Sequence, residues 1–117
     1  MAREIAKDVY DLASRGPLSK DYGLRDQMQR AAVSIGSNIA EGFERDSNAE
    51  FVKFLGYAKG SSGELLSQLI TAKDVGYIQS PDLDRMAEKI KMTSRMIARF
   101  RDTLSDSPVK GRRWKTP

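Results

Sequence analysis

The placement of the four prolines constrains the fold of this chain more than any other feature of its sequence. The four prolines, Pro17, Pro81, Pro108 and Pro117, all lie in or beside short polar segments that are typical of turns and loops. The long intervals between them therefore contain no residue that forbids a helix. Within these intervals apolar residues recur at steps of three and four, and no stretch shows the sustained alternation that is typical of a strand. The sequence therefore predicts an all-α protein.

Four helices are expected, and their apolar stripes have the spacing of an antiparallel bundle seam. The expected ranges are 2–14, about 24–42, about 47–76 and 80–104. Gly42 is interpreted as a C-terminal cap, Ser47 and Glu50 as a capping box, and Ser80 as an N-cap before Pro81. The last stripe comprises Leu83, Met86, Ile90, Thr93, Ile97, Phe100 and Leu104. Short connections favour an up-and-down four-helix bundle.

Composition excludes many classes of protein. The 117 residues include no Cys and no His, which removes thiol nucleophiles, Ser-His triads and zinc-type clusters. A Mg²⁺ site or carboxylate catalysis would need converging acidic residues in a chain whose net charge is +4. We therefore expect no enzymatic activity, no metal and no cofactor. No apolar run is long enough to span a bilayer, so a cytoplasmic protein without a membrane partner is expected.

The C-terminal residues form a separate unit in this interpretation. Residues 105–117 contain four basic residues and one acid, and so carry +3 of the net charge of +4. Their Pro, Gly and Ser content predicts a basic tail without its own fold. The expected organisation is a bundle over 1–104 followed by a tail over 105–117.

Basic side chains on the last helix predict a nucleic-acid surface. A step of 100° per residue places five of them in one sector, and the basic tail continues from the same helix. Lys and Arg can neutralise phosphates, and a tryptophan can stack on an exposed base. The alternative is a solvated bundle face with a solubilising tail. The predicted contacts are Arg85, Lys89, Lys91, Arg95, Arg99, Lys110, Arg112, Arg113, Trp114 and Lys115.

A second set of residues predicts contacts between copies of the chain. Met92 and Met96 fall away from the apolar seam, and Tyr57 lies between Gly56 and Gly60, whose spacing permits close approach of another helix. The alternative is an ordinary surface with scattered apolar side chains. The first interpretation predicts a homo-oligomer with these five residues at its interface.

Polar residues around the end of the second helix predict a structural network. Asn38 and Glu41 interrupt a run of small apolar residues, and Ser61 and Glu64 lie beside the apolar stripe of the third helix. Such side chains can satisfy one another between helices. A catalytic carboxylate at Glu41 or Glu64 is the alternative, although neither has a converging acid or base in the sequence pattern.

Several segments carry a resemblance to a known family. The segment from Tyr22 to Phe43, which contains Ser-Asn-Ile-Ala-Glu-Gly, is the most specific. Shorter matches are Glu50-Phe51, Phe54-Leu55, Lys59-Gly-Ser61, Glu64-Leu65 and Gly76-Tyr77-Ile78. Over residues 1–104 the chain resembles the bacterial 23S rRNA-intervening sequence proteins, a family named for reading frames inside intervening sequences of large-subunit ribosomal RNA genes.

The resemblance implies a four-helix bundle that assembles into a ring-like homopentamer. Relatives of the family include accessory proteins of diversity-generating retroelements, which bind a reverse transcriptase and nucleic acid. The resemblance supplies no catalytic residues. The leading hypothesis is therefore an oligomer that binds RNA or DNA, with a reverse transcriptase as a candidate partner. The other hypothesis is a structural scaffold that binds only a protein.

Overall fold

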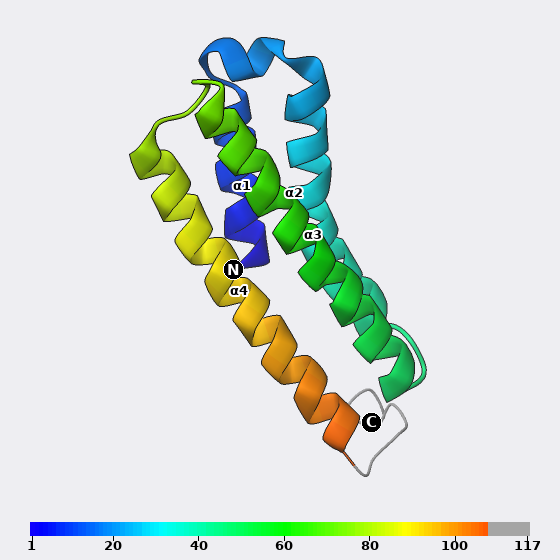
Figure 1. Ribbon diagram of the computed structural model, residues 1–117. Helices are drawn as coiled ribbons and strands as arrows, with labels where there is room; N and C mark the ends of the chain where they lie inside the picture. Colours follow the sequence, from blue (N-terminus) through cyan, green and yellow to red (C-terminus); the bar gives the residue numbers. More distant parts are fainter. Residues whose placement is uncertain (108–117) are drawn as a thin grey trace.

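The computed structural model describes residues 1–107, which form four α-helices joined by short connections (Figure 1). The helices are α1 (Ala2–Ala13), α2 (Tyr22–Phe43), α3 (Asn48–Asp74) and α4 (Ser80–Asp106), with a 3-10 helix, η1 (Gly16–Lys20), between the first two. Successive helices run in opposite directions, and no strand occurs in the described part of the chain. The prediction of an all-α four-helix protein is confirmed.

The core follows the predicted stripes closely. In α1, Ile5, Val9 and Leu12 are buried. In α3 the apolar stripe at steps of four and three is buried throughout, and it comprises Phe51, Leu55, Ala58, Ser62, Leu65, Leu69 and Ala72. In α4 the stripe departs from full burial at Leu83, which is half-buried, and at Phe100, whose exposed fraction is 45%. Because α1 has 12 residues and α4 has 27, α1 does not reach this part of α4 (Figure 1). The outer side of Phe100 is therefore left without a covering helix among residues 1–107.

The helix ends show how local sequence fixes the connections. Asp21 caps α2 by accepting a hydrogen bond from the Leu24 N–H at 3.1 Å, and Ser47 caps α3 through the Glu50 N–H at 3.2 Å. Gly76 ends the third helix with a φ of 85°, a conformation that favours glycine. The fourth helix begins one residue earlier than predicted, because Gln79 and not Ser80 occupies the N-cap position.

The interpretation of Gly42 as a helix cap was wrong. Gly42 is buried inside α2, and a Cβ atom there would lie 2.8 Å from Phe51 Cδ1 and 2.8 Å from Phe54 Cβ. Ordinary contacts between carbon atoms are about 3.5–4.0 Å long. Glycine is therefore needed because α2 and α3 approach each other closely at this point.

Candidate nucleic-acid interface

The packing of α1 against α4 neutralises one of the five basic residues in the predicted sector of α4. Lys89 Nζ lies 2.6 Å from Asp8 Oδ2 and 3.9 Å from Glu4 Oε1, and its side chain is only 28% exposed. These contacts tie α1 to α4, so the Lys89 charge is already engaged within the fold. The sequence pattern could not show this, because it does not reveal which side of α4 faces α1.

Arg85 is also partly neutralised by its own helix. Its Nη2 atom lies 3.2 Å from Asp82 Oδ1, one turn earlier, although the guanidinium remains exposed. An exposed pair of this kind can exchange its carboxylate for a phosphate at small cost, because surface ion pairs contribute little free energy. Arg85 therefore lies at the edge of the basic surface and not at its centre.

Three of the predicted cations remain exposed and form no ion pair with any residue in 1–107: Lys91, Arg95 and Arg99. We call these residues the α4 ridge. They follow one another at i, i+4 and i+8, which corresponds to a spacing of about 6 Å along the helix axis. The ridge is the part of the predicted surface that can offer its charge to a ligand.

Sequence reasoning missed one neighbour of the ridge. Arg101 is half-buried, and its Nη1 atom lies 3.9 Å from the position that a Cβ of Gly56 would occupy. The guanidinium therefore lies along α3, where the absence of a side chain on Gly56 leaves room for it. The antiparallel register of α3 and α4 would be needed to foresee this contact from the sequence. The remaining predicted contacts, Lys110, Arg112, Arg113, Trp114 and Lys115, lie outside the described residues.

The five residues predicted at an oligomer interface lie on two helices, Gly56, Tyr57 and Gly60 on α3 and Met92 and Met96 on α4. Met92 and Met96 are 40% and 53% exposed, and Met96 lines a hollow together with the start of α1. Tyr57 lies on α3 and is 48% exposed, and its ring packs edge-on against Phe54, with the ring centroids 5.4 Å apart. A Cβ added at Gly60 would meet nothing within 4 Å, so no described part of this chain uses the close approach that glycine permits.

The polar network exists between α2 and α3, and it contains two of its four predicted members, Asn38 and Ser61. Asn38 donates to Ser34 Oγ at 2.8 Å and to the Ser34 carbonyl at 2.9 Å, and Ser34 Oγ lies 2.9 Å from Ser61 Oγ. Ser34 is thus the bridging residue, and its position one turn before Asn38 was the available signal. The network lies in a half-buried region beside the core.

Glu41 and Glu64 lie outside this network, which corrects the prediction. Glu41 forms an ion pair of 2.8 Å with Arg45, and Glu64 accepts a hydrogen bond from Gln68 at 3.3 Å. Both carboxylates are exposed. A carboxylate on a helix contacts a side chain four residues along the same helix more readily than a side chain on a neighbouring helix.

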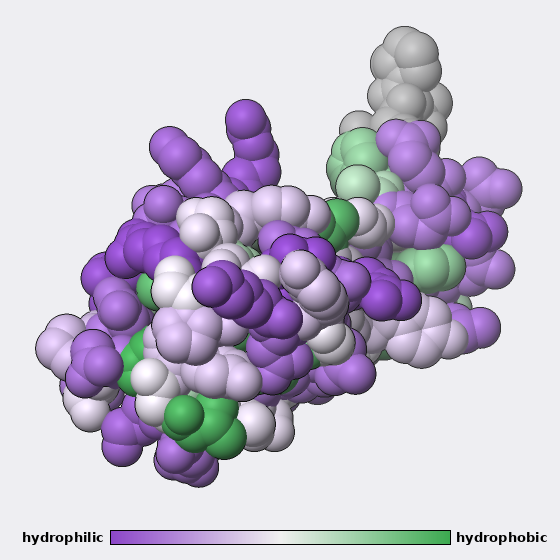
Figure 2. Space-filling model, turned by 90° about the horizontal axis from the view of Figure 1, so that it is seen from above, coloured by the Kyte–Doolittle hydropathy of each residue, from purple (hydrophilic) through white to green (hydrophobic). Residues whose placement is uncertain are grey.

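The surface of the bundle is mainly hydrophilic in the view along its length, with isolated apolar groups (Figure 2). Among residues 1–107, no group of three acidic residues is arranged so that it could hold a metal ion. No helix in the same range is both long and apolar enough to cross a membrane.

Comparisons with known proteins give one family and one fold. Residues 1–99 match the sequence profile of the family described as 23S rRNA-intervening sequence protein. The structure is similar to that of a protein of unknown function from the S23 ribosomal protein family of Bacteroides thetaiotaomicron, with a TM-score of 0.81 and 20% sequence identity. That similarity covers 87% of this chain and 92% of the other. No curated protein matches the sequence.

Proposed function

Since the chain belongs to the 23S rRNA-intervening sequence protein family, we propose that it is a non-enzymatic, oligomeric bundle that binds RNA or DNA through backbone phosphates. The α4 ridge is the observation that carries this proposal. Its three cations are exposed, and no carboxylate of residues 1–107 neutralises them. Phosphate contacts by such residues release counterions from the nucleic acid, which favours binding without regard to base sequence.

Assembly strengthens the proposed binding. Three cations on one subunit give a weak site, whereas a ring repeats the ridge and the basic residues 110–115 in every subunit. The resemblance noted above implies five subunits and includes an accessory role beside a reverse transcriptase, and the hydropathy pattern of the sequence favours a cytoplasmic location. We include these features in the proposal.

The first experiment measures binding and mass together. Fluorescence anisotropy of labelled single-stranded and duplex RNA should show binding by the parent protein at low salt. Light scattering should show one species near five times the subunit mass of 13.1 kDa. A monomer that persists at high micromolar concentration would reject the oligomer, and an absence of binding at low salt would reject the nucleic-acid function.

A charge-matched pair of variants identifies the surface. The ridge variant combines Lys91→Gln, Arg95→Gln and Arg99→Gln. The control replaces three basic residues near the other end of the bundle, Arg15, Lys20 and Lys73, by Gln. Both variants lose the same charge, so a general electrostatic effect would weaken them equally. We expect the ridge variant to lose roughly tenfold or more in affinity and the control to lose much less.

The scaffold hypothesis keeps one observation in its favour. Met96 and Phe100 remain 53% and 45% exposed on the flank of α4 that α1 leaves uncovered. Exposed apolar side chains that lie together mark a protein contact more often than a nucleic-acid contact.

A further inference from the structure

A shallow hollow lies on the surface where α1 packs against α2. We call it the α1–α2 hollow. Its volume is about 320 Å³, and it is lined by Tyr10 of α1 and by four residues of α2, Asp26, Gln29, Arg30 and Val33. Sites for small molecules have volumes of about 300–1,000 Å³, so this hollow has room for one small planar group and not for an extended peptide.

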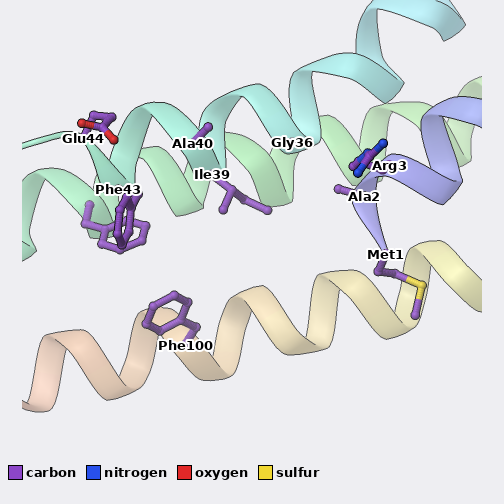
Figure 3. A pocket seen from close by; sticks show the side chains of 10 residues that line it. Met1, Ala2, Arg3, Gly36, Ile39, Ala40, Phe43, Glu44 and Phe100 are labelled. Atoms are coloured by element: carbon purple, nitrogen blue, oxygen red, sulfur yellow. The ribbon is translucent and has the colours of Figure 1, made fainter. Parts of the chain in front are cut away.

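The antiparallel packing of α1 and α2 brings these residues together. At the start of α1, a Cβ added at Gly36 would lie 3.6 Å from Ala2 Cβ, and Figure 3 shows Ala2 and Arg3 beside the segment of α2 that contains Gly36. Further along α1, Tyr10 reaches the part of α2 that precedes Gly36 by one to three turns. The hollow is therefore positioned by the register of two helices and not by a loop.

The hollow faces away from the acidic side of α1. Glu4 and Asp8 lie on the side of α1 that faces Lys89 of α4. Tyr10 follows Asp8 by two residues, which corresponds to about 200° around the helix, so its side chain lies on the opposite flank. The carboxylates of α1 therefore separate the hollow from the α4 ridge, and a ligand in the hollow does not compete for the ridge cations.

The polar groups that line the hollow have few partners within residues 1–107. Arg30 forms no ion pair there, and Gln29 and the Tyr10 hydroxyl form no hydrogen bond. Asp26 Oδ1 lies 3.1 Å from both Nε and Nη2 of Arg25, whereas its Oδ2 has no partner in this range. The hollow therefore offers an amide, a carboxylate oxygen, a hydroxyl and a guanidinium to a ligand.

This combination of groups matches a nucleobase with its phosphate. Tyr10 and Val33 are 50% and 45% exposed, and an aromatic ring of this kind offers a stacking face to a base. The amide of Gln29 can pair in both directions with the amino group and ring nitrogen of adenine, and the carboxylate of Asp26 can accept from an amino group. Arg30 supplies a cation for a phosphate. A purely apolar ligand would leave these polar groups without partners.

We propose that the α1–α2 hollow binds an unstacked base of single-stranded RNA or DNA and prefers adenine. The base stacks on Tyr10, Gln29 and Asp26 contact its edge, and Arg30 binds the adjacent phosphate. Lys7 lies one turn before Tyr10, is exposed and forms no ion pair within residues 1–107, so it is available to a further phosphate of the strand. This inference rests on the proposed nucleic-acid function. It adds a preference for single strands, because a base inside a duplex has no free stacking face.

The test compares short single strands of one base. Fluorescence anisotropy at low salt measures the affinity of the full chain for labelled oligoadenylate and oligouridylate of equal length. Oligoadenylate should bind more tightly, because uracil has no amino group. Tyr10→Ala should weaken the binding of oligoadenylate at least about fivefold, since it removes the stacking face. Tyr10→Phe keeps the ring and should bind like the parent.

Matched variants separate the hollow from the rest of the surface. Tyr57→Ala removes an aromatic ring that is 48% exposed on α3 and should leave the affinity unchanged. Tyr10→Ala should keep the salt dependence of the parent, because it removes no cation. Gln29→Leu should bring the affinities for the two strands closer together. Circular dichroism checks that the variants fold. Unchanged oligoadenylate affinity in folded Tyr10→Ala protein, or an unchanged preference for adenine in folded Gln29→Leu protein, would overturn the inference.

Failure of this inference and failure of the proposed function give different results. If the parent binds both strands at low salt and Tyr10→Ala binds them equally well, the hollow is excluded and the phosphate-binding function stands. If the parent binds neither strand, the nucleic-acid function is rejected, and calorimetric titration with adenosine monophosphate decides the hollow. Saturable binding that ribose 5-phosphate does not reproduce, and that Tyr10→Ala removes, supports a nucleotide site. The absence of such binding overturns it.

Discussion

Gly42→Ala tests the close approach of α2 and α3, on which the shape of the bundle depends. The added methyl group would lie 2.8 Å from Phe54 Cβ and 2.8 Å from Phe51 Cδ1, about 0.7 Å inside the shortest ordinary carbon contact. Phe54 Cβ is fixed to the α3 backbone, and the Phe51 ring is held between Phe43 and Phe100. Neither atom can move away without displacing a helix or a packed ring.

The expected magnitude follows from two opposing effects. Overpacking costs about 1–3 kcal/mol, and replacing glycine by alanine inside a helix returns at most about 1 kcal/mol, less near a helix end. A net loss of about 1–2 kcal/mol in the free energy of unfolding should lower the melting temperature by about 4–8 °C. Thermal unfolding followed by circular dichroism measures this change.

Gly63→Ala is the matched control. Gly63 lies inside α3, and an added Cβ there meets nothing within 4 Å. The same substitution should therefore stabilise the protein by about 0.5–1 kcal/mol, because only the helix propensity changes. If Gly42→Ala melts at or above the parent temperature, the steric argument for the α2–α3 contact is wrong.

Three other substitutions test individual contacts. Lys89→Gln should lower the melting temperature by several degrees, because Asp8 loses its partner, while RNA affinity measured by anisotropy stays unchanged. Asn38→Leu should cost about 1–3 kcal/mol in urea unfolding, the net value of the two hydrogen bonds that Asn38 donates to Ser34, while the Ser34 hydroxyl keeps its Ser61 partner. The pKa of Tyr77 is raised above 10.0, first by the hydrogen bond that its hydroxyl donates to Asp21 and then by burial and the nearby carboxylate charge. The resulting stabilisation is complete below pH 10 and is lost as pH rises further, so the stability difference between the parent and Tyr77→Phe should stay constant up to about pH 9 and shrink above pH 10.

Local periodicity explains how much of the fold could be predicted. The steps of three and four between apolar residues along α3 indicate which residues lie on the same face of the helix. One face of a bundle helix is buried regardless of which helices pack against it, so the buried residues of α3 could be predicted. The same reasoning misplaced Phe100, because its exposure depends on where α1 stops. It also misread Gly42, because a glycine at the end of a helical pattern is more often a cap than a point of close contact.

The candidate site was predictable only in part, for a related reason. Lys89 and Lys91 lie about 160° apart on a helical wheel, at the two edges of the predicted basic sector. Lys89 pairs with Asp8, whereas Lys91 forms no ion pair within residues 1–107. The difference arises from the carboxylates of α1, which reach only one side of α4. The bridge between Asn38 and Ser61 was missed similarly, since Ser34 acquires its role from the register of two helices.

The dependence of affinity on salt tests the central claim most directly. Each phosphate contact adds about 0.9 to the slope of log affinity against log salt on duplex DNA. If the α4 ridge binds phosphates, the combined Lys91→Gln, Arg95→Gln and Arg99→Gln variant should show a slope smaller than the parent's by about 2.7 for each ridge engaged. The variant with Arg15, Lys20 and Lys73 replaced by Gln should keep the parent slope. Equal slopes for the parent and the ridge variant would contradict the account.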